Sequence, residues 1–288
     1  MASEQAFRVV ARRCLIGLTT RHHQTSIGDP RALHQMRVAL TRLRAAVAFF
    51  TPIASEPEWE RLKREFKWIN GYLGATRDLD VFMHTAPGDG AAGTGRRTGA
   101  LDRRWVASHL RLTRALHSRR YQRLIASLSA WIDREREPVA TDARSRTTRL
   151  LPISTYATRV LTRWHREIVE KSRKLDTMTA DKRHRLRIRT KKLRYAIEWF
   201  GGLPPRSPPW QRAMLKQLRK AQDALGELND AACAEALAKS SRKVAQDHKQ
   251  DHKQDRKTAL VDARRERRLL SITKAAYQKL GKLASLSR

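Results

Sequence analysis

The sequence of 288 residues lacks the features of several common protein classes. Its two cysteines, Cys14 and Cys233, lie far apart and form no C-x-x-C motif, so neither a disulfide framework nor a zinc site is indicated. We expect two buried, reduced thiols. No apolar run approaches the roughly 20 residues of a membrane span, and charges interrupt the N-terminal stretch where a signal peptide would be apolar. We therefore expect a soluble, cytoplasmic protein with no membrane partner.

Acidic residues are also scarce, because 28 Asp and Glu stand against 61 Lys and Arg and leave a formal net charge of +33. Such an excess predicts a polyanionic partner or surface, although it says nothing about the fold. No cluster of carboxylates could hold Mg²⁺ for phosphoryl transfer or polymer hydrolysis. No second carboxylate recurs at catalytic spacing beside Asp78 and Asp230, which we interpret as structural residues that orient a neighbouring arginine. We predict no catalytic residue, no metal and no cofactor.

Strand patterns and exposed aromatic residues are the remaining shortages. Neither alternating nor β-branched runs occur at useful length, and apolar residues recur at helical spacing instead. Aromatic residues make up 6% of the chain; Phe50, Trp199 and Phe200 lie on or beside core faces, and Tyr195 alone stands within a basic row. Base stacking requires exposed aromatic rings, and no helix-turn-helix, zinc finger or RNA-binding motif is visible. An all-α protein is predicted, and nucleic acid ranks below a simpler polyanion.

The stretch 183–200, RHRLRIRTKKLRYAIEWF, contains seven Lys or Arg and one acid. Its apolar residues recur at helical spacing and predict one core face, formed by Leu186, Leu193, Ile197 and Phe200. The other side lines up like charges, which destabilises a helix by about 0.2–0.5 kcal/mol per pair, whereas a simple solvated face would mix signs. This side is better explained as a surface for a polyanion. The row comprises His184, Arg187, Lys191 and Arg194.

The stretch 33–50, LHQMRVALTRLRAAVAFF, repeats this pattern, and LGATRDLD at 73–80 similarly answers LGELNDAA at 225–232. Two blocks in the same order at nearly the same separation indicate an internal duplication. We predict two halves, 1–150 and 151–288, that form one compact unit with pseudo-twofold symmetry. The shared glycine of the second block suggests close helix approach. Matching residues are His34 with His184, Arg37 with Arg187, Arg42 with Lys192, Arg44 with Arg194, Gly74 with Gly226 and Asp78 with Asp230.

Capping residues, prolines and glycine-rich stretches along the chain predict four helices in each half. Asp29 is suited to cap the second helix, with Pro30 at its first position. The glycine-rich stretch 87–99 lacks the GK[ST] ending and the preceding strand of a phosphate loop, so we interpret it as a linker. The repeat QDHKQDHKQDRK at 246–257 is interpreted as a solvated helical extension, with a metal pair at His248 and His252 as the alternative. Predicted helices span 3–23, 30–52, 56–82, 100–137, 154–175 and 183–200, with two more beginning at 210 and ending near 283.

The blocks LHQMRVALTRLR, LGATRDLDVF, RHRLRIRTKKLRYAIEWF and AQDALGELND resemble the CHAD domain, an all-helical family named for its histidines. The resemblance covers most of the chain, and the four blocks stand in family order. It implies two pseudo-symmetric four-helix bundles with a basic groove or channel between and along them. It also implies binding of inorganic polyphosphate, association with polyphosphate granules in the cytoplasm and no established catalytic activity.

A phosphate polymer requires regularly spaced donors that tolerate many registers. Arginine offers a planar fork, lysine a mobile charge, and a histidine such as His34 gains charge when it donates to phosphate. Core histidines and metal ligation are the alternatives, although a basic neighbourhood repels cations. We expect inorganic polyphosphate or other phosphate or sulfate anions as partners; nucleic acid and a role as a granule-coating protein are the rival interpretations, and the oligomeric state is not readable. Predicted polyphosphate-binding residues are His34, Arg37, Arg42, Arg44, His184, Arg187, Lys191, Lys192, Arg194, Arg8, Arg12, Arg159, Arg163, Arg166, Lys67 and Lys216.

Overall fold

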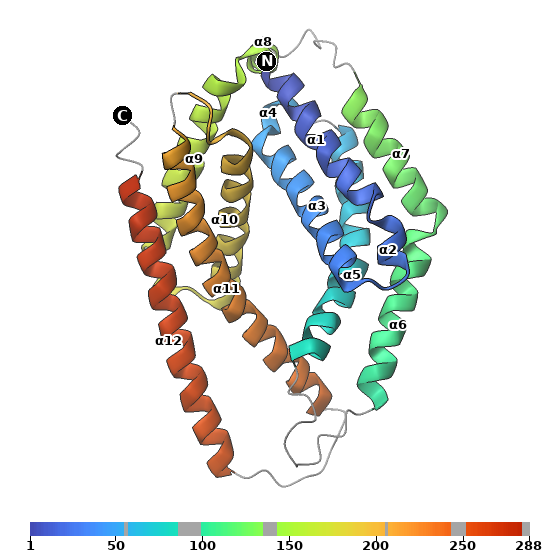
Figure 1. Cartoon of the computed structure of the whole chain (residues 1–288), viewed down its shortest axis with the longest axis vertical. Helices are drawn as coiled ribbons and strands as arrows, with labels where there is room; N and C mark the ends of the chain where they lie inside the picture. The colour runs from blue at the N-terminus through green and yellow to red at the C-terminus, as the bar shows by residue number, and fades with distance from the viewer. Residues whose placement is uncertain (55–56, 86–98, 135–142, 205–206, 243–251, 284–288) are drawn as a thin grey trace. The chain divides into compact units, whose positions relative to one another are not determined.

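The fold was described from a computed structural model that covers residues 1–54, 57–85, 99–134, 143–204, 207–242 and 252–283, without the side chains of 84–85, 100–101, 143–146, 232–242 and 252–262. Within these ranges the chain is helical and contains no strand, apart from an isolated antiparallel bridge between Ala2 and Pro152. Figure 1 shows the order of the helices. The all-α prediction is confirmed. No helix in the described part is long and apolar enough to cross a membrane.

The chain divides into two compact units, an N-terminal unit, Met1–Ile153, and a C-terminal unit, Ser154–Arg288. In the N-terminal unit, α3 packs against α1 and α5, while α7 packs against α1, α5 and α6. Ser3 ties the start of the chain to the end of this unit, because its backbone N–H donates to Leu151 O at 2.9 Å. The helices are α1 (Ser3–Thr19), α2 (His22–Ser26), α3 (Pro30–Phe49), α4 (Thr51–Ala54), α5 (Pro57–Thr85), α6 (Gly99–Leu116), α7 (Arg119–Asp133) and α8 (Ala143–Leu150).

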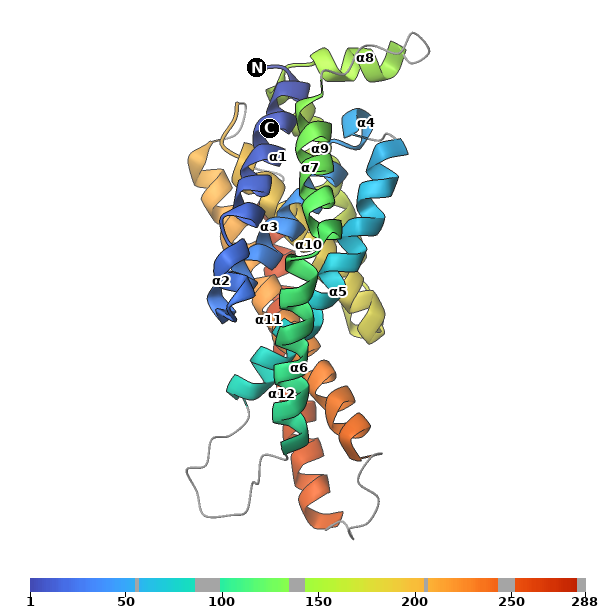
Figure 2. The same cartoon turned by 90° about the vertical axis from the view of Figure 1, so that its right-hand side faces the viewer.

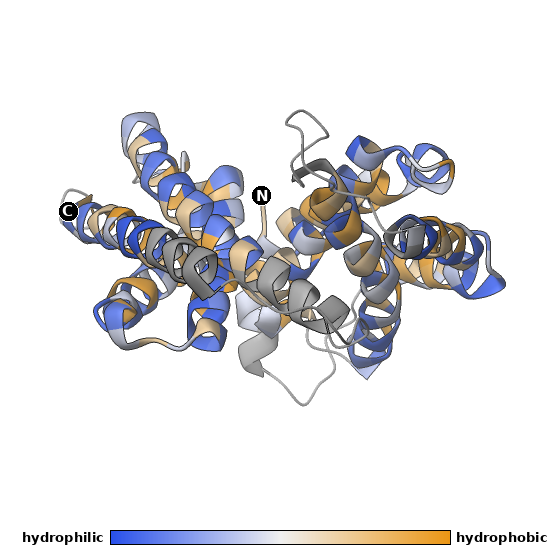
Figure 3. Ribbon diagram, turned by 90° about the horizontal axis from the view of Figure 1, so that it is seen from below, coloured by the Kyte–Doolittle hydropathy of each residue, from blue (hydrophilic) through white to orange (hydrophobic). Residues whose placement is uncertain are grey.

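An aromatic cluster forms the centre of the N-terminal unit. Phe7 of α1 meets the ring of Phe50 edge-on at a centroid distance of 5.6 Å and that of Trp131 at 5.4 Å. All three side chains are fully buried, and burial of each aromatic side chain stabilises the fold by about 1.5–3 kcal/mol. In Figure 3 the orange, hydrophobic residues of this unit gather where its helices meet. The repeated pattern at 33–50 predicts a core face on α3 like that of the stretch 183–200, and its apolar residues are buried: Met36, Leu40, Leu43 and Val47.

In the C-terminal unit, α11 packs against both α10 and α12. The four apolar residues predicted to form the core face of α10 are buried, as the spacing indicated. A polar contact joins α10 to α12, because the hydroxyls of Thr190 and Tyr277 lie 2.7 Å apart in the interior. Desolvation by this burial raises the pKa of Tyr277 above its usual range. The helices are α9 (Ile153–Ser172), the short 3-10 helix η1 (Leu175–Thr177), α10 (Ala180–Phe200), α11 (Pro208–Arg242) and α12 (His252–Leu283).

Two predicted long helices of the N-terminal unit are each divided, which corrects the prediction of four helices in that half, whereas the described part of the C-terminal unit has four α-helices, α9 to α12. The span 100–137 splits into α6 and α7 at Ser118, whose hydroxyl accepts a hydrogen bond from Tyr121 N–H at 3.2 Å and donates to Ala115 O at 2.7 Å. Ser118 thus caps a new helix where continuation was predicted, and Figure 2 shows the break between α6 and α7. The span 3–23 ends at Thr20, whose hydroxyl bonds back to Ile16 O, a contact that competes with helix continuation.

Local capping at the start of α3 follows the prediction. The Asp29 side chain accepts hydrogen bonds from the N–H groups of Arg31 at 2.7 Å and Ala32 at 3.2 Å, and Pro30 occupies the first helical position. Such a cap contributes about 1 kcal/mol. The polypeptide enters this helix through Gly28, which has a φ of +93° that side chains disfavour.

The shared glycine does not mark close helix approach, which corrects a second prediction. A Cβ atom added to Gly74 would meet no atom within 4 Å, and one added to Gly226 would meet only the guanidinium of Arg187, at 3.6 Å. The internal duplication itself stays a prediction. The linker 87–98 and the repeat at 246–251 fall outside the described residues, and the remainder of that repeat, 252–257, is described without its side chains.

Candidate functional site

The basic row on α3 is exposed but partly neutralised by the helix that packs beside it. His34 and Arg44 are exposed, and Arg37 retains 30% of its side-chain surface. Arg37 Nη1 donates to Asp78 Oδ1 of α5 at 3.5 Å, which is an outer limit for an ion-paired hydrogen bond. Arg44 has no ion pair or hydrogen bond with the described residues. The α3 row therefore carries one engaged arginine and one available arginine.

Arg42 points to the other flank of α3, away from Arg37 and Arg44. Its positive charge acts on Cys14 of α1, where burial raises the pKa of the thiol to about 12 and Arg42 opposes that rise. Cys14 is buried and its thiol is free, as predicted. Helical periodicity already separates Arg42 from Arg37 by five residues, or about 140° around the axis. Both residues are predicted to bind polyphosphate, and the structure places them on different flanks of α3.

On α10, an amide holds the histidine of the row, and one arginine of the row has no ion pair or hydrogen bond with the residues that the structure describes. His184 Nδ1 lies 2.8 Å from Asn229 Oδ1 of α11, so the ring donates from Nδ1 to this oxygen and leaves Nε2 on the exposed side. Arg187 is half-buried, and its Nη2 atom lies beside the backbone at Gly226. Its Nε is buried without a hydrogen-bond partner, and no carboxylate pairs with it in the described part of the chain.

The other predicted binding cations of α10 have interaction partners of their own. Arg194 Nε is 3.8 Å from Glu198 Oε1, and its guanidinium lies 5.0 Å from the ring centre of Tyr195. Lys191 and Lys192 are half-buried and also contact other residues. Arg194 is 23% exposed at its side chain. The row thus presents Arg187 and His184 with more freedom than Arg194.

Further predicted cations lie exposed on other helices. Arg159, Arg163 and Arg166 are exposed along α9, where none forms an ion pair with residues that the structure describes. Lys67 on α5 and Lys216 on α11 are also exposed and lack a carboxylate partner in the same described ranges. Exposed cations without partners keep their full hydration and can neutralise phosphates at little cost in lost protein contacts.

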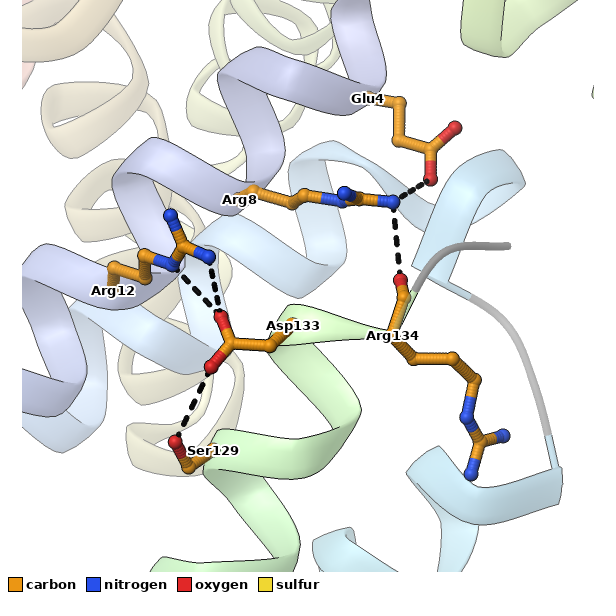
Figure 4. Close-up of polar contacts among 6 residues, drawn as sticks. All are labelled: Glu4, Arg8, Arg12, Ser129, Asp133 and Arg134. Atoms are coloured by element: carbon orange, nitrogen blue, oxygen red, sulfur yellow. Dashed lines mark hydrogen bonds and ion pairs between the residues drawn. The ribbon is translucent and has the colours of Figure 1, made fainter. Parts of the chain in front are cut away.

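Arg8 and Arg12 differ from the other predicted residues, because they bind the protein itself. Figure 4 shows Arg12 of α1 against Asp133 of α7, with Nε–Oδ1 and Nη2–Oδ1 distances of 2.8 Å. Arg8 donates to Glu4 at 3.0 Å and to the carbonyl of Arg134 at 3.1 Å. These contacts fasten α1 to the end of α7. The structure therefore gives Arg8 and Arg12 a role within the N-terminal unit.

The sequence pattern did not reveal a buried polar cluster between α5 and α6. Asp80 is fully buried, and its Oδ1 accepts from Trp105 Nε1 at 2.9 Å and lies 2.9 Å from His109 Nε2. Thr76 and Ser108 share a second buried contact at 2.9 Å. The available signal was position: residues 73, 76 and 80 recur at helical spacing and lie on the apolar face. An acid on that face requires a buried partner.

Tyr195 was predicted to stand within a basic row, and this is wrong. Its side chain is 3% exposed and belongs to the core of the C-terminal unit. Its residue number places it one step beyond Arg194, and that step turns it about 100° toward the interior. Consequently the α10 row lacks the exposed aromatic ring at this position that base stacking would use. Within the described residues, no group of three or more His, Cys, Asp or Glu side chains could hold a metal ion.

Comparison with known proteins identified a family model and solved structures of similar fold. The family model described as CHAD domain matches residues 10–239. The crystal structure of the CHAD domain from the plant Ricinus communis is 27% identical, with a TM-score of 0.74 over 96% of this chain and 92% of that chain. PptA from Streptomyces chartreusis is 15% identical, with a TM-score of 0.54 over 99% of this chain and all of that chain, and it shows similarity of fold alone. No curated protein matches the sequence.

Proposed function

Because this chain belongs to the CHAD domain family, we propose that its basic helices bind inorganic polyphosphate and that this binding is not coupled to catalysis. The family resemblance supplies the ligand class, and the charge of +33 supplies the affinity for a polyanion. The proposed contacts are the exposed and half-buried cations of α3, α9 and α10, together with Lys67 and Lys216. Other phosphate or sulfate anions offer the same tetrahedral oxygen geometry and are expected to compete.

Arg187 is the observation that carries the proposal. A half-buried guanidinium without a carboxylate costs free energy, because part of its hydration is lost and no protein acceptor replaces it. A phosphate oxygen would supply that acceptor and form a charge-assisted contact worth about 1.5–3 kcal/mol. His184, three residues earlier on the same face, is exposed, and its protonated ring would donate to the same ligand from Nε2.

Asp78 and Asp80, the acids of the block at 73–80, do not suit a phosphoryl-transfer site. Asp78 is engaged by Arg37, and Asp80 is buried with Trp105 and His109. Phosphoryl transfer uses carboxylates that hold Mg²⁺ at the transferred group. These contacts support a binding function in which the polymer leaves as it arrived.

Nucleic acid is the rival ligand, and a competition experiment separates the two. Labelled long-chain polyphosphate is bound to the protein and displaced by double-stranded DNA at equal phosphate concentration, at several salt concentrations. Both ligands release counterions, so both affinities fall as salt rises. We expect polyphosphate to displace DNA and not the reverse, because a site that contacts only phosphates gains no binding energy from the bases of DNA. Displacement of polyphosphate by DNA would transfer the proposal to nucleic acid.

We extend the proposal to the cell, where the protein would associate with polyphosphate granules. A fluorescent fusion should follow granules that are stained for polyphosphate and disperse when polyphosphate is enzymatically removed. A fusion that remains localised after removal would indicate attachment through another partner.

A further inference from the structure

Asp78 and Asp230 are matched acids with different surroundings. Each lies four residues after the glycine of its block, Asp78 on α5 and Asp230 on α11. Asp78 engages Arg37 of α3 at 3.5 Å, with 61% of its side-chain surface still exposed. Asp230 is exposed and has no ion pair or hydrogen bond with the described residues. The aspartate therefore pairs with an arginine of the basic row in the N-terminal unit, whereas its counterpart in the C-terminal unit has no such pair among the described residues.

The Arg37–Asp78 pair is of the kind that a ligand can displace. It is long, and both side chains are accessible to water and salt. Exposed ion pairs of this type change an equilibrium by only about fivefold or less. A phosphate that uses Arg37 must nevertheless break or share this contact, and it then sits close to the negative charge of Asp78.

Resting on the proposed function, we propose that Asp78 competes with the ligand for Arg37 and thereby makes the α3 row favour long polyphosphate over short phosphates. Arg44 lies seven residues beyond Arg37 on the same side of α3, roughly 10 Å along the helix axis. It is exposed and has no partner among the described residues. A long chain held at Arg44 presents further phosphates to Arg37 at high effective concentration.

A short phosphate lacks that advantage. A ligand that reaches only Arg37 arrives from free solution and must displace Asp78. Its affinity therefore falls by the full factor by which the ion pair stabilises Arg37. A polymer already held by Arg44 replaces the carboxylate in an intramolecular step. Asp78 consequently weakens short ligands more than long ones, which makes it a specificity-determining residue and not a ligand.

The test uses Asp78→Asn with Asp230→Asn as its matched control. Both changes remove one negative charge from an exposed position after the same glycine, but only the first breaks an ion pair. Binding of tripolyphosphate and of long-chain polyphosphate is measured by calorimetry in an Arg187→Ala, Arg194→Ala background, which removes the contribution of the two arginines of the α10 row. We expect Asp78→Asn to tighten tripolyphosphate binding about fivefold, with a smaller gain for the long chain. Asp230→Asn should change either affinity by less than about twofold, because a solvated charge acts through a screened field.

An Arg37→Ala variant completes the cycle. The gain from Asp78→Asn should vanish in that variant, because the contested side chain is gone. Equal gains from Asp78→Asn and Asp230→Asn, equal gains for both chain lengths, or a gain that survives Arg37→Ala would each overturn the inference. Failure of the proposed function looks different, because the unmodified protein would then bind neither ligand.

Discussion

The basic rows on α3 and α10 have similar residues, yet their neighbours leave them in different electrostatic states. On α3, a carboxylate of the adjacent helix engages Arg37. On α10, the adjacent helix offers the amide of Asn229 to His184, and Arg187 has a buried Nε with no acceptor. An amide oxygen orients a histidine without cancelling positive charge, whereas a carboxylate cancels it.

Two rows with the same basic pattern therefore need not bind phosphate with the same strength. The α10 row contains an arginine that gains an acceptor on binding, while Arg37 exchanges one acceptor for another. Only the arginine that gains an acceptor obtains the full free energy of a charge-assisted contact on binding. We therefore expect the C-terminal unit to hold the stronger phosphate contacts and the N-terminal unit to hold contacts that depend on the ligand.

The largest expected effect comes from removing both rows together. Replacing Arg37, Arg44, Arg187 and Arg194 by Ala should weaken polyphosphate binding by orders of magnitude and reduce the salt slope by up to about four units. The control replaces four exposed arginines that have no ion pair in the described residues, two in each unit: Arg104, Arg114, Arg264 and Arg268. The control should cost about tenfold or less, through general electrostatics. Equal losses would mean that binding is diffuse and that the rows have no special role.

A second prediction compares the rows directly. Arg187→Ala should weaken polyphosphate binding about tenfold to a hundredfold, because a charge-assisted contact is lost. Arg37→Ala should weaken polyphosphate binding about fivefold less than Arg187→Ala does, because the ligand must displace Asp78 from Arg37 before it can bind there. Affinity is measured at one salt concentration, with thermal unfolding as the control for folding. A larger loss from Arg37→Ala would reverse the ranking of the two rows.

A third prediction makes α10 resemble α3. Asn229→Asp would place a carboxylate beside His184, as Asp78 stands beside Arg37, and should weaken polyphosphate binding about three- to fivefold. Gln278→Glu, on the exposed side of α12, changes the net charge equally and serves as the control. If the two variants weaken binding equally, the amide at position 229 does not set the strength of the row.

The smallest expected effect concerns the stability of the C-terminal unit as pH falls. His165 is buried and hydrogen-bonded to Leu280 O at 3.0 Å, and desolvation lowers its pKa below the ordinary value of 6.5. The unfolded chain therefore binds a proton more readily below pH 6.5 than the folded chain does, and stability falls as pH decreases through that window. The loss is at most about 1.4 kcal/mol per pH unit.

The measurement is chemical unfolding at a series of pH values, compared with His165→Gln. Glutamine can still donate to the Leu280 carbonyl but does not titrate, so the dependence below pH 6.5 should shrink in that variant. The N-terminal unit should not share the change. An unchanged pH profile in His165→Gln would assign the dependence to another group.

Much of the helical structure followed from local patterns. Apolar spacing identified the core faces of α3 and α10, and the Asp29–Pro30 pair identified where α3 begins. Local signals were also misread: Ser118 divides a predicted helix, and Tyr195, interpreted as part of a basic row, is a core residue. At Ser118, a capping hydrogen bond ended the helix although the surrounding pattern was helical. At Tyr195, the angular position on the helix turned the side chain into the core although its neighbours are basic.

The predicted binding residues fall into two groups, those exposed to solvent and those engaged by other parts of the protein. Arg44, Arg159, Arg163 and Arg166 are exposed cations, whereas Arg8 and Arg12 fasten α1 to the end of α7. Position on a basic helix face was the same evidence for all of them. Nothing in that evidence showed that Asp133 and the carbonyl of Arg134 would lie beside α1, because they come from a segment more than a hundred residues later.

An all-helical protein with a large excess of positive charge is predictable from the amino-acid sequence, because periodicity and charge are properties of the chain before it folds. Which of those charges stay available depends on how the helices pack. An arginine is neutralised when the helix packed beside it brings a carboxylate within hydrogen-bonding distance, as Asp78 does for Arg37. Arg187 remains available because α11 places Gly226 beside it, while the amide of Asn229 on the same helix contacts His184 without cancelling charge. Ionic contacts act over a few ångströms in water and salt, so their pairing depends on packing that composition and spacing do not contain.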